Sequence, residues 1–153
     1  MNIEIVPFKN EYAAAVSKII IDNLTKINLN DYGDEVIKIL CLFYTPDCII
    51  RYSKNEDIFV ALSDSEVIGT VSVLESRVRN LFVKIEFQRK GIGQDLIRFV
   101  ESAAKEKNME RLFLSSNLSA VGFYEKLGFI SVEISNEDVG GMNMRLNLME
   151  KYL

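Results

Sequence analysis

The chain has 153 residues, of which 48% are hydrophobic and 26% charged, and its net charge is −4. These values predict one soluble domain over residues 1–153, and the negative charge argues against nonspecific nucleic-acid binding. No stretch is apolar for the length of a membrane span, and the first residues lack the basic and apolar regions of a signal peptide. We therefore expect a cytoplasmic protein that does not associate with membranes.

The chain has two cysteines and no histidine. Cys41 and Cys48 lie in apolar neighbourhoods, and no histidine is present to complete a zinc site with them. We therefore expect two free, buried thiols and no bound metal. The lack of histidine also excludes nucleophilic mechanisms that use a Ser–His or Cys–His pair.

The first part of the chain predicts one strand followed by helices. Alternation over residues 3–5 indicates a short strand, and apolar spacing predicts a helix over residues 10–24. Residues 25–30 are polar and resemble a turn. Asn30 or Asp31 can begin a second helix that extends as far as residue 44. Thr45-Pro46 ends that helix and is typical of the start of a short third one.

Strand patterns follow. Residues 57–62 and 66–74 read as two strands, and the Ser63-Asp64-Ser65 turn between them is typical of a hairpin. Residues 76–80 then form a turn that leads into the next strand. Over residues 81–87 apolar side chains alternate with others, which predicts a strand with one buried face. The alternating apolar residues are Leu81, Val83, Ile85 and Phe87.

From Ile92 the apolar period changes to that of a helix, with one face formed by Ile92, Leu96, Phe99, Val100, Ala103 and Ala104. A strand is expected over residues 111–115. Two further strands close the chain. The first carries Ile130, Val132 and Ile134 on one face, and the second carries Met142, Met144, Leu146 and Leu148.

The segment Gln88-Arg89-Lys90-Gly91-Ile92-Gly93 lies where the predicted strand turns into a helix. Glycine permits close approach of a ligand to the backbone, and the free N–H groups of a helix start favour an anion. The segment therefore predicts a phosphate or pyrophosphate site. It lacks the Lys-Ser/Thr of a Walker loop, and Leu96 stands where a dinucleotide fingerprint would have a third glycine.

A second motif covers residues 117–129. Asn117 and Ser119 are typical of a helix start, and Gly128 is placed to end that helix, with Phe129 packing back on it. Between them the sequence has Phe123-Tyr124.

Together the two motifs resemble the Gln/Arg-x-x-Gly-x-Gly/Ala turn and the Asn-Ala-Phe-Tyr-Gly-Phe pattern of the GNAT N-acetyltransferases. The resemblance is specific over residues 67–129. It implies an α/β fold with a mixed, mostly antiparallel central sheet and flanking helices, in the order β-α-α-β-β-β-α-β-α-β-β. It also implies acetyl-CoA as the acetyl donor, an amine as the acceptor and direct attack in a ternary complex, and it leaves room for a homodimer.

The resemblance also assigns roles to residues of this chain. Backbone N–H groups that follow Gln88 should form a cradle and hold the pyrophosphate. They belong to Arg89, Lys90, Gly91, Ile92, Gly93 and Gln94. Backbone groups of Leu81, Phe82 and Val83 should pair with the pantetheine arm, where this strand and residues 111–115 splay apart. Tyr124 is the candidate general acid for the leaving thiolate, or else a core aromatic like Phe123. Asn117 should contact the cofactor, order water near it or cap a helix.

No general base is assigned. Many family members have a glutamate four residues before the position of Leu81, but here that residue is Arg77. Glu75, Ser115 and Ser116 are weak candidates, and a water chain to solvent would serve as well.

The acceptor side should be formed by the first two helices. The carboxylates there would suit an amine, or else belong to a solvated loop; the residues are Asp22, Asp31, Tyr32, Asp34 and Glu35. A non-catalytic acyl-CoA-binding module and an interaction subunit remain as alternatives.

Overall fold

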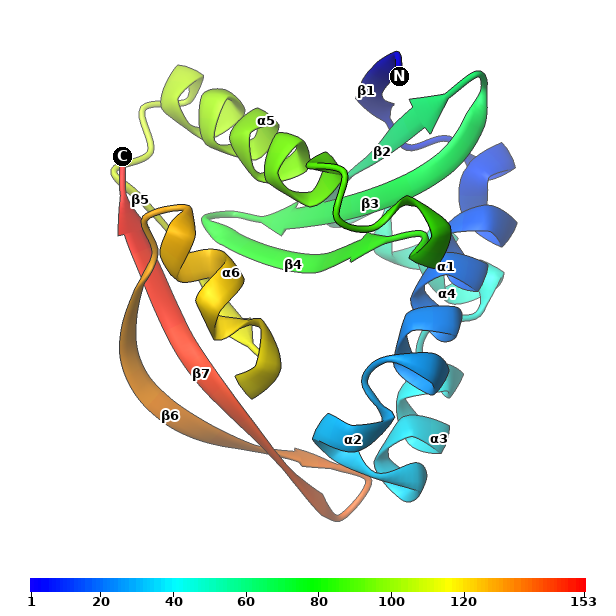
Figure 1. Ribbon diagram of the computed structural model, residues 1–153, viewed down its shortest axis with the longest axis vertical. Coiled ribbons are helices and arrows are strands. Elements are labelled where there is room, and N and C mark those ends of the chain that lie inside the picture. The colour runs from blue at the N-terminus through cyan, green and yellow to red at the C-terminus, as the bar shows by residue number, and fades with distance from the viewer.

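The computed structural model describes residues 1–153 and contains one seven-stranded sheet with helices on both faces (Figure 1). The order of the strands across the sheet is β1-β2-β3-β4-β5-β7-β6. All neighbouring strands are antiparallel except β4 and β5, which are parallel. The strands are β1 (Ile3–Pro7), β2 (Asp57–Ser63), β3 (Glu66–Leu74), β4 (Arg77–Val83), β5 (Arg111–Ser116), β6 (Ile130–Val139) and β7 (Met142–Tyr152).

Two hydrophobic clusters hold the helices on opposite faces of the sheet. One cluster joins α5 to β3, β5 and β7, and α6 packs against it. The other joins α1, α3 and α4 to the opposite face of β2 and β3. The helices are α1 (Ala13–Lys26), α2 (Leu29–Tyr32), α3 (Asp34–Leu42), α4 (Pro46–Tyr52), α5 (Ile92–Glu106) and α6 (Val121–Lys126). This mixed architecture is the fold class that the sequence predicts.

The predicted second helix is wrong in one respect, because the structure divides it into α2 and α3 at Gly33. This glycine has φ +82, which a residue inside an α-helix does not adopt. The predicted turn over residues 25–30 is also too long, since α1 continues through Lys26 and α2 begins at Leu29. The short third helix is confirmed as α4, with the side chain of Thr45 accepting a hydrogen bond from the Cys48 N–H at 3.3 Å.

The predicted strand over residues 81–87 is correct only as far as Val83, where β4 ends. The Lys84 N–H still donates to the Ile68 carbonyl at 2.8 Å, and residues Ile85–Phe87 then form a 3₁₀ turn. The alternating pattern predicted too long a strand, because Phe87 lies outside the sheet but packs on the same hydrophobic cluster as Leu81 and Val83.

The hairpin between β2 and β3 is confirmed, with Asp64 and Ser65 both at positive φ in a two-residue turn.

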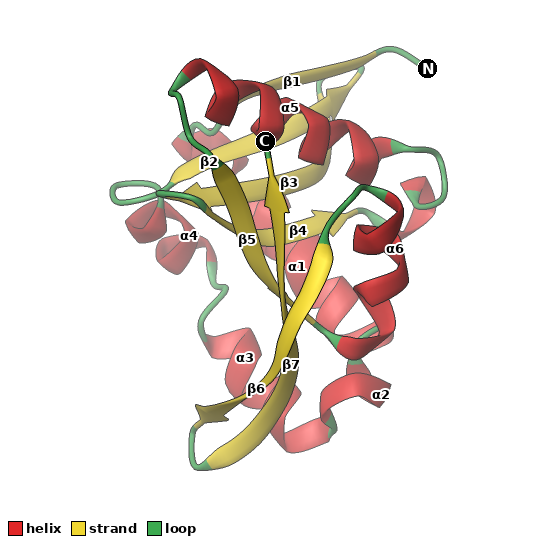
Figure 2. Cartoon of the chain, turned by 90° about the vertical axis from the view of Figure 1, so that its left-hand side faces the viewer, coloured by secondary structure: helices red, strands yellow, loops and turns green.

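The sheet opens between β4 and β5. The two strands share a single residue pair, Arg77 with Phe113, beside a hydrogen bond of 3.0 Å from the Phe113 N–H to the Ser76 carbonyl. Beyond this point β5, β7 and β6 turn away from β1–β4, as Figures 1 and 2 show. β4 also has an irregularity in its pairing with β3, at Asn80, which has φ +52. The divergence leaves one edge of β4 without a partner strand.

Candidate functional site

A cavity of about 720 Å³ lies where β4 and β5 diverge. Its walls come from α1, α2, α3, β4, the start of α5 and the loop before it, the end of β5, α6 and β7. The structure brings most of the predicted site residues to this cavity. Those that line it are Leu81, Phe82, Val83, Gln88, Arg89, Gly91, Ile92, Gly93, Gln94, Asn117 and Tyr124.

The loop before α5 has the geometry of an anion site. Arg89 and Gly91 have φ +61 and +84, and Gly91 is the N-cap of α5. For Arg89 this conformation costs about 1–2 kcal/mol, which a surrounding structure must stabilise. The first helical bond runs from the Asp95 N–H to the Gly91 carbonyl at 3.0 Å, so the N–H groups that precede it in the first turn have no partner within the helix.

The two glycines of this loop serve different purposes. A Cβ at Gly91 would meet no atom within 4 Å, so glycine is needed there for its backbone angle. A Cβ at Gly93 would lie 3.3 Å from Cζ of Phe123, so glycine is needed there for space. Phe123 was expected in the core, but its ring lines the cavity and is 39% exposed. The sequence could not show which of the adjacent residues Phe123 and Tyr124 is the more exposed, because a helix of only six residues is too short for its apolar spacing to define a buried face.

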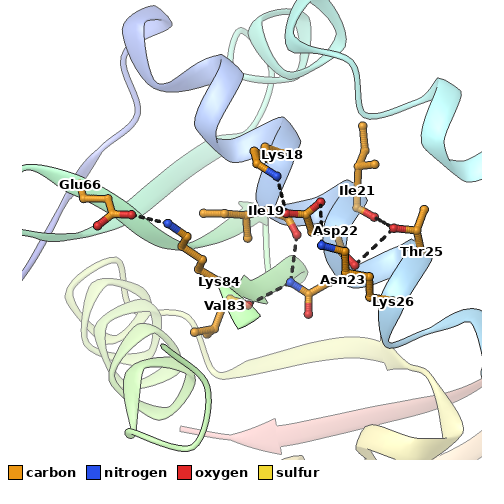
Figure 3. Close-up of polar contacts among 10 residues, drawn as sticks. All are labelled: Lys18, Ile19, Ile21, Asp22, Asn23, Thr25, Lys26, Glu66, Val83 and Lys84. Atoms are coloured by element: carbon orange, nitrogen blue, oxygen red, sulfur yellow. Dashed lines mark hydrogen bonds and ion pairs between the residues drawn. The ribbon is translucent and has the colours of Figure 1, made fainter. Parts of the chain in front are cut away.

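The side chain of Gln88 is engaged within the protein. Its Nε2 donates to Oδ1 of Asn23 at 2.8 Å and to the Val83 carbonyl at 3.1 Å. Asn23 in turn donates through Nδ2 to the same Val83 carbonyl and to the Ile19 carbonyl, both at 2.9 Å (Figure 3). Gln88 therefore ties the loop before α5 to α1 and to the end of β4.

Asn23, which is buried and lines the cavity, was not among the predicted site residues. Its signal was a lone amide on the apolar face of α1, between Ile20 and Leu24. A buried polar side chain must be hydrogen-bonded, and such a position indicates a partner from elsewhere in the fold.

These contacts reduce the number of residues whose backbone groups could pair with the pantetheine arm. Lys84 bonds to β3, so by the alternation of an antiparallel ladder the groups of Phe82 also face β3, whereas those of Val83 face the opening. The Val83 carbonyl already accepts two amide donors, which leaves its N–H for a ligand. Of the three predicted residues, Leu81 and Val83 thus stay candidates through their backbone, and Phe82 does not.

Tyr124 lies on α6 with its ring against Phe123 and Phe129, at centroid distances of 5.0 and 5.9 Å. It lines the cavity, and its hydroxyl makes no hydrogen bond within the protein. Burial raises the pKa of Tyr124 above its ordinary value, because the charged phenolate is poorly solvated there. The phenol is therefore neutral at physiological pH and carries a proton that it can donate.

Asn117 has the cap role that its sequence position allowed, since its Oδ1 accepts from the Ala120 N–H at 3.1 Å. Its Nδ2 lies 3.4 Å from Oδ2 of Asp31. The same carboxylate oxygen accepts from Ser119 and from Asn28, both at 3.1 Å. Asp31 thus links α2 to the loop that follows β5, across the cavity.

The structure does not support any of the weak candidates for a general base. The guanidinium of Arg77 donates to Oγ of Ser115 at 3.3 Å and lies 4.7 Å from the ring centre of Phe113. Ser116 donates to the Asn117 carbonyl at 2.7 Å. Both serines thus lack a basic partner, and Glu75 lies outside the cavity lining.

Of the five residues expected on the acceptor side, only Tyr32 lines the cavity. Asp34 and Glu35 are exposed in the first turn of α3. Asp22 pairs with Lys18 at 2.8 Å on the outer side of α1 (Figure 3).

No group of His, Cys, Asp and Glu side chains is arranged to hold a metal ion. No helix has both the length and the apolar character needed to cross a bilayer.

Comparison with known proteins agrees with this geometry. The family model described as "Acetyltransferase (GNAT) domain" matches residues 28–151. An uncharacterized N-acetyltransferase of Bacillus subtilis, YobR, is 38% identical over 79 residues, which are 46% of this chain; the match spans about a third (32%) of that relative's length.

Two solved structures have the same fold. A GCN5-related N-acetyltransferase from Rhodopseudomonas palustris superposes with a TM-score of 0.93 at 17% identity, and the match covers 100% of this chain and 97% of the other. The PaiA N-acetyltransferase from Thermoplasma acidophilum, in complex with coenzyme A, has a TM-score of 0.79 at 24% identity and 100% coverage of both chains. Because the family model matches residues 28–151, which are most of the sequence, this chain belongs to the GNAT acetyltransferase family.

Proposed function

We propose that this chain is an acetyl-CoA-dependent N-acetyltransferase, which moves the acetyl group to a primary amine by direct attack in a ternary complex. The observation that carries the proposal is the divergence of β4 and β5 after Arg77. It creates one cavity that reaches from the start of α5 to Tyr124. The coenzyme A found with the PaiA relative supports the choice of donor.

In this mechanism the start of α5 binds the pyrophosphate. The free N–H groups of Ile92, Gly93 and Gln94 and the charge of Arg89 favour the anion, and Lys90 adds a cation beside the ring of Phe87. The Val83 N–H would hold the pantetheine arm along the open edge of β4.

The chemical step then needs one proton donor. The amine nitrogen bonds to the thioester carbon, and the C–S bond breaks as the tetrahedral intermediate collapses. The departing sulfur takes a proton from the Tyr124 hydroxyl, and the proton lost by nitrogen restores the phenol through water. Burial keeps Tyr124 protonated and so suited to this role.

The cofactor assignment is tested with Gly91→Glu. The new carboxylate would stand at the N-terminus of α5, where it would repel a pyrophosphate. Acetyl-CoA should raise the melting temperature of the native protein by mass action, and this shift should vanish in the variant.

Gly141→Glu is a matched control for this experiment. Gly141, in the turn between β6 and β7, has φ +85 and, like Gly91, open space around it, so a side chain there also meets an unfavourable positive φ at a site away from α5. The control should lose stability but keep the shift. An unchanged melting-temperature shift in Gly91→Glu would refute the assignment of the pyrophosphate site to the start of α5.

The same assay separates the alternatives. A non-catalytic acyl-CoA-binding module would show the shift but release no thiol with any amine in a broad acceptor screen. An interaction subunit would show no shift. The cytoplasmic location and a homodimer stay predictions, to be tested by cell fractionation and by the mass in solution.

A further inference from the structure

We call one part of the cavity the acceptor end. It is lined by residues of α1, α2, α3 and β7 and of the link between α1 and α2, together with Asn80 of β4 and Tyr44. Its side chains are aliphatic or neutral and polar. Arg89, in the loop before α5, is the one charged side chain that lines the cavity. The residues of the acceptor end are Leu24, Ile27, Asn28, Tyr32, Leu40, Tyr44, Asn80, Met144 and Leu146.

The polar groups of the acceptor end are held in their neutral forms. The Tyr44 hydroxyl donates to Oδ1 of Asn80 at 2.8 Å, and burial raises the pKa of Tyr44 to about 12. Burial also raises the pKa of Tyr32, and the nearby carboxylates of Asp31 and Glu137 raise it further. Both phenols therefore keep their protons over the whole physiological range, and neither supplies a negative charge to an acceptor.

Three carboxylates near this end are hydrogen-bonded, exposed or paired. Oδ2 of Asp31 accepts three hydrogen bonds, from Asn28, Asn117 and Ser119. Glu137 lies on β6 with its side chain exposed to solvent. Behind Tyr44, the Glu56 carboxylate is paired with Arg79 at 2.6 Å. The lining thus offers an incoming cation aromatic rings and amides, and no carboxylate in direct contact; the charges of Asp31 and Glu137 act on it only from outside the lining.

We infer that the acceptor is an amine that is uncharged at neutral pH and is carried on a compact apolar or aromatic body. An alkylammonium would lose its hydration in this cavity without a carboxylate in direct contact, which disfavours the charged form. A weakly basic amine, such as an aromatic amine, enters without that loss. It also already carries the lone pair that attacks the thioester. This inference rests on the proposed acetyl transfer.

The β6–β7 hairpin adds a limit on shape. A Cβ at Gly140, in the turn of this hairpin, would lie 2.7 Å from Cδ1 of Ile39 on α3. The hairpin therefore reaches across the opening and rests on the helical side, as Figure 1 shows. A compact acceptor suits the resulting enclosure better than an extended peptide does.

The test compares two matched amines, 4-methoxyaniline, which is neutral at pH 7, and 4-methoxybenzylamine, which is protonated. Their dissociation constants are measured by calorimetry with the full chain saturated with CoA, which has no acetyl group to transfer. We expect the aniline to bind at least tenfold more tightly at pH 7. The affinity of the benzylamine should rise about tenfold per pH unit as its neutral fraction grows.

Asn80→Asp should reverse this preference, because it adds a carboxylate to the acceptor end with little change of shape. Aspartate tolerates the φ of +52 at this position. Asp34→Asn removes a carboxylate from an exposed site and is the matched control that should leave both affinities unchanged. Asp31→Asn should leave the ratio of the two affinities unchanged.

Equal or tighter binding of the benzylamine to the native complex would overturn the inference, as would binding of neither amine. So would loss of benzylamine binding in Asp31→Asn, since Asp31 would then be the counterion. CoA binding, measured first, separates the two claims. Failure to bind CoA would remove the proposed function and the inference together, whereas CoA binding with preference for the cation would remove the inference alone.

Discussion

Replacing Tyr124 by phenylalanine removes one oxygen atom that has no hydrogen bond within the protein. The ring contacts with Phe123 and Phe129 stay, so the free energy of unfolding should change by no more than about 0.5 kcal/mol. For a chain of this length such a change shifts the melting temperature by about 2 °C or less. If the phenol protonates the leaving thiolate, kcat should nevertheless fall by about 10²-fold or more, which corresponds to about 2.7 kcal/mol of transition-state stabilisation.

The assay is thiol release at saturating acetyl-CoA, with single-turnover measurements to establish that chemistry limits the rate. Tyr44→Phe is the comparison, because its hydroxyl does have a partner, Asn80 at 2.8 Å. That variant should lose about 1 kcal/mol of stability. A near-normal kcat in Tyr124→Phe under rate-limiting chemistry would return this residue to a packing role.

The pH profile gives a second readout on Tyr124. Because burial raises the pKa of its phenol above 10.0, the proton donor is retained as the pH rises through the neutral and mildly alkaline range. The kcat profile should therefore show no alkaline descent below about pH 10. For a lysine-like amine kcat/KM should rise with pH over this range, because only the deprotonated amine attacks.

Three further outcomes concern stability. Gly69→Ala places a Cβ 3.1 Å from the nearest α5 side-chain atom and should cost about 1–3 kcal/mol in urea unfolding, whereas Gly122→Ala, in open space on α6, should gain about 0.5–1 kcal/mol. Arg79→Leu leaves the carboxylate of Glu56, whose side chain is 5% exposed, without its partner and should cost about 3 kcal/mol; Glu56→Leu in the same chain should restore most of this. Since burial raises the pKa of Tyr44 from 10.0 to about 12, its contribution to stability is fully present below pH 10 and is lost as the pH rises through about 12. The melting temperature should fall over that window, and fall less in Tyr44→Phe.

Local patterns were sufficient to predict most of the fold. Apolar spacing predicts α1 and α5, Thr45-Pro46 predicts the start of α4, and the polar turn Ser63-Asp64-Ser65 predicts the β2–β3 hairpin. These features depend on neighbours in the sequence. The end of β4 at Val83 does not, because Phe87 still packs against the hydrophobic cluster after the strand has ended.

The candidate site divides in the same way. The predicted cradle around Gly91 is a local turn, and its glycines and cations are adjacent in the sequence. The roles of Gln88 and Asp31 are long-range, since their partners Asn23 and Asn117 lie far away in the sequence. Neither partner can be deduced from periodicity, and both became evident only where the fold brought the segments together.

The contact between Gly140 and Ile39 joins two segments that are distant in the sequence. Closing so long a loop loses much chain entropy before the contact stabilises anything, so we expect it to form after the local hairpins and helices. The walls of the cavity would then exist before the cavity is closed. In the folded protein the same contact should be among the first to open, and amide hydrogens of the hairpin tip should exchange with solvent well before those of β3 and α5.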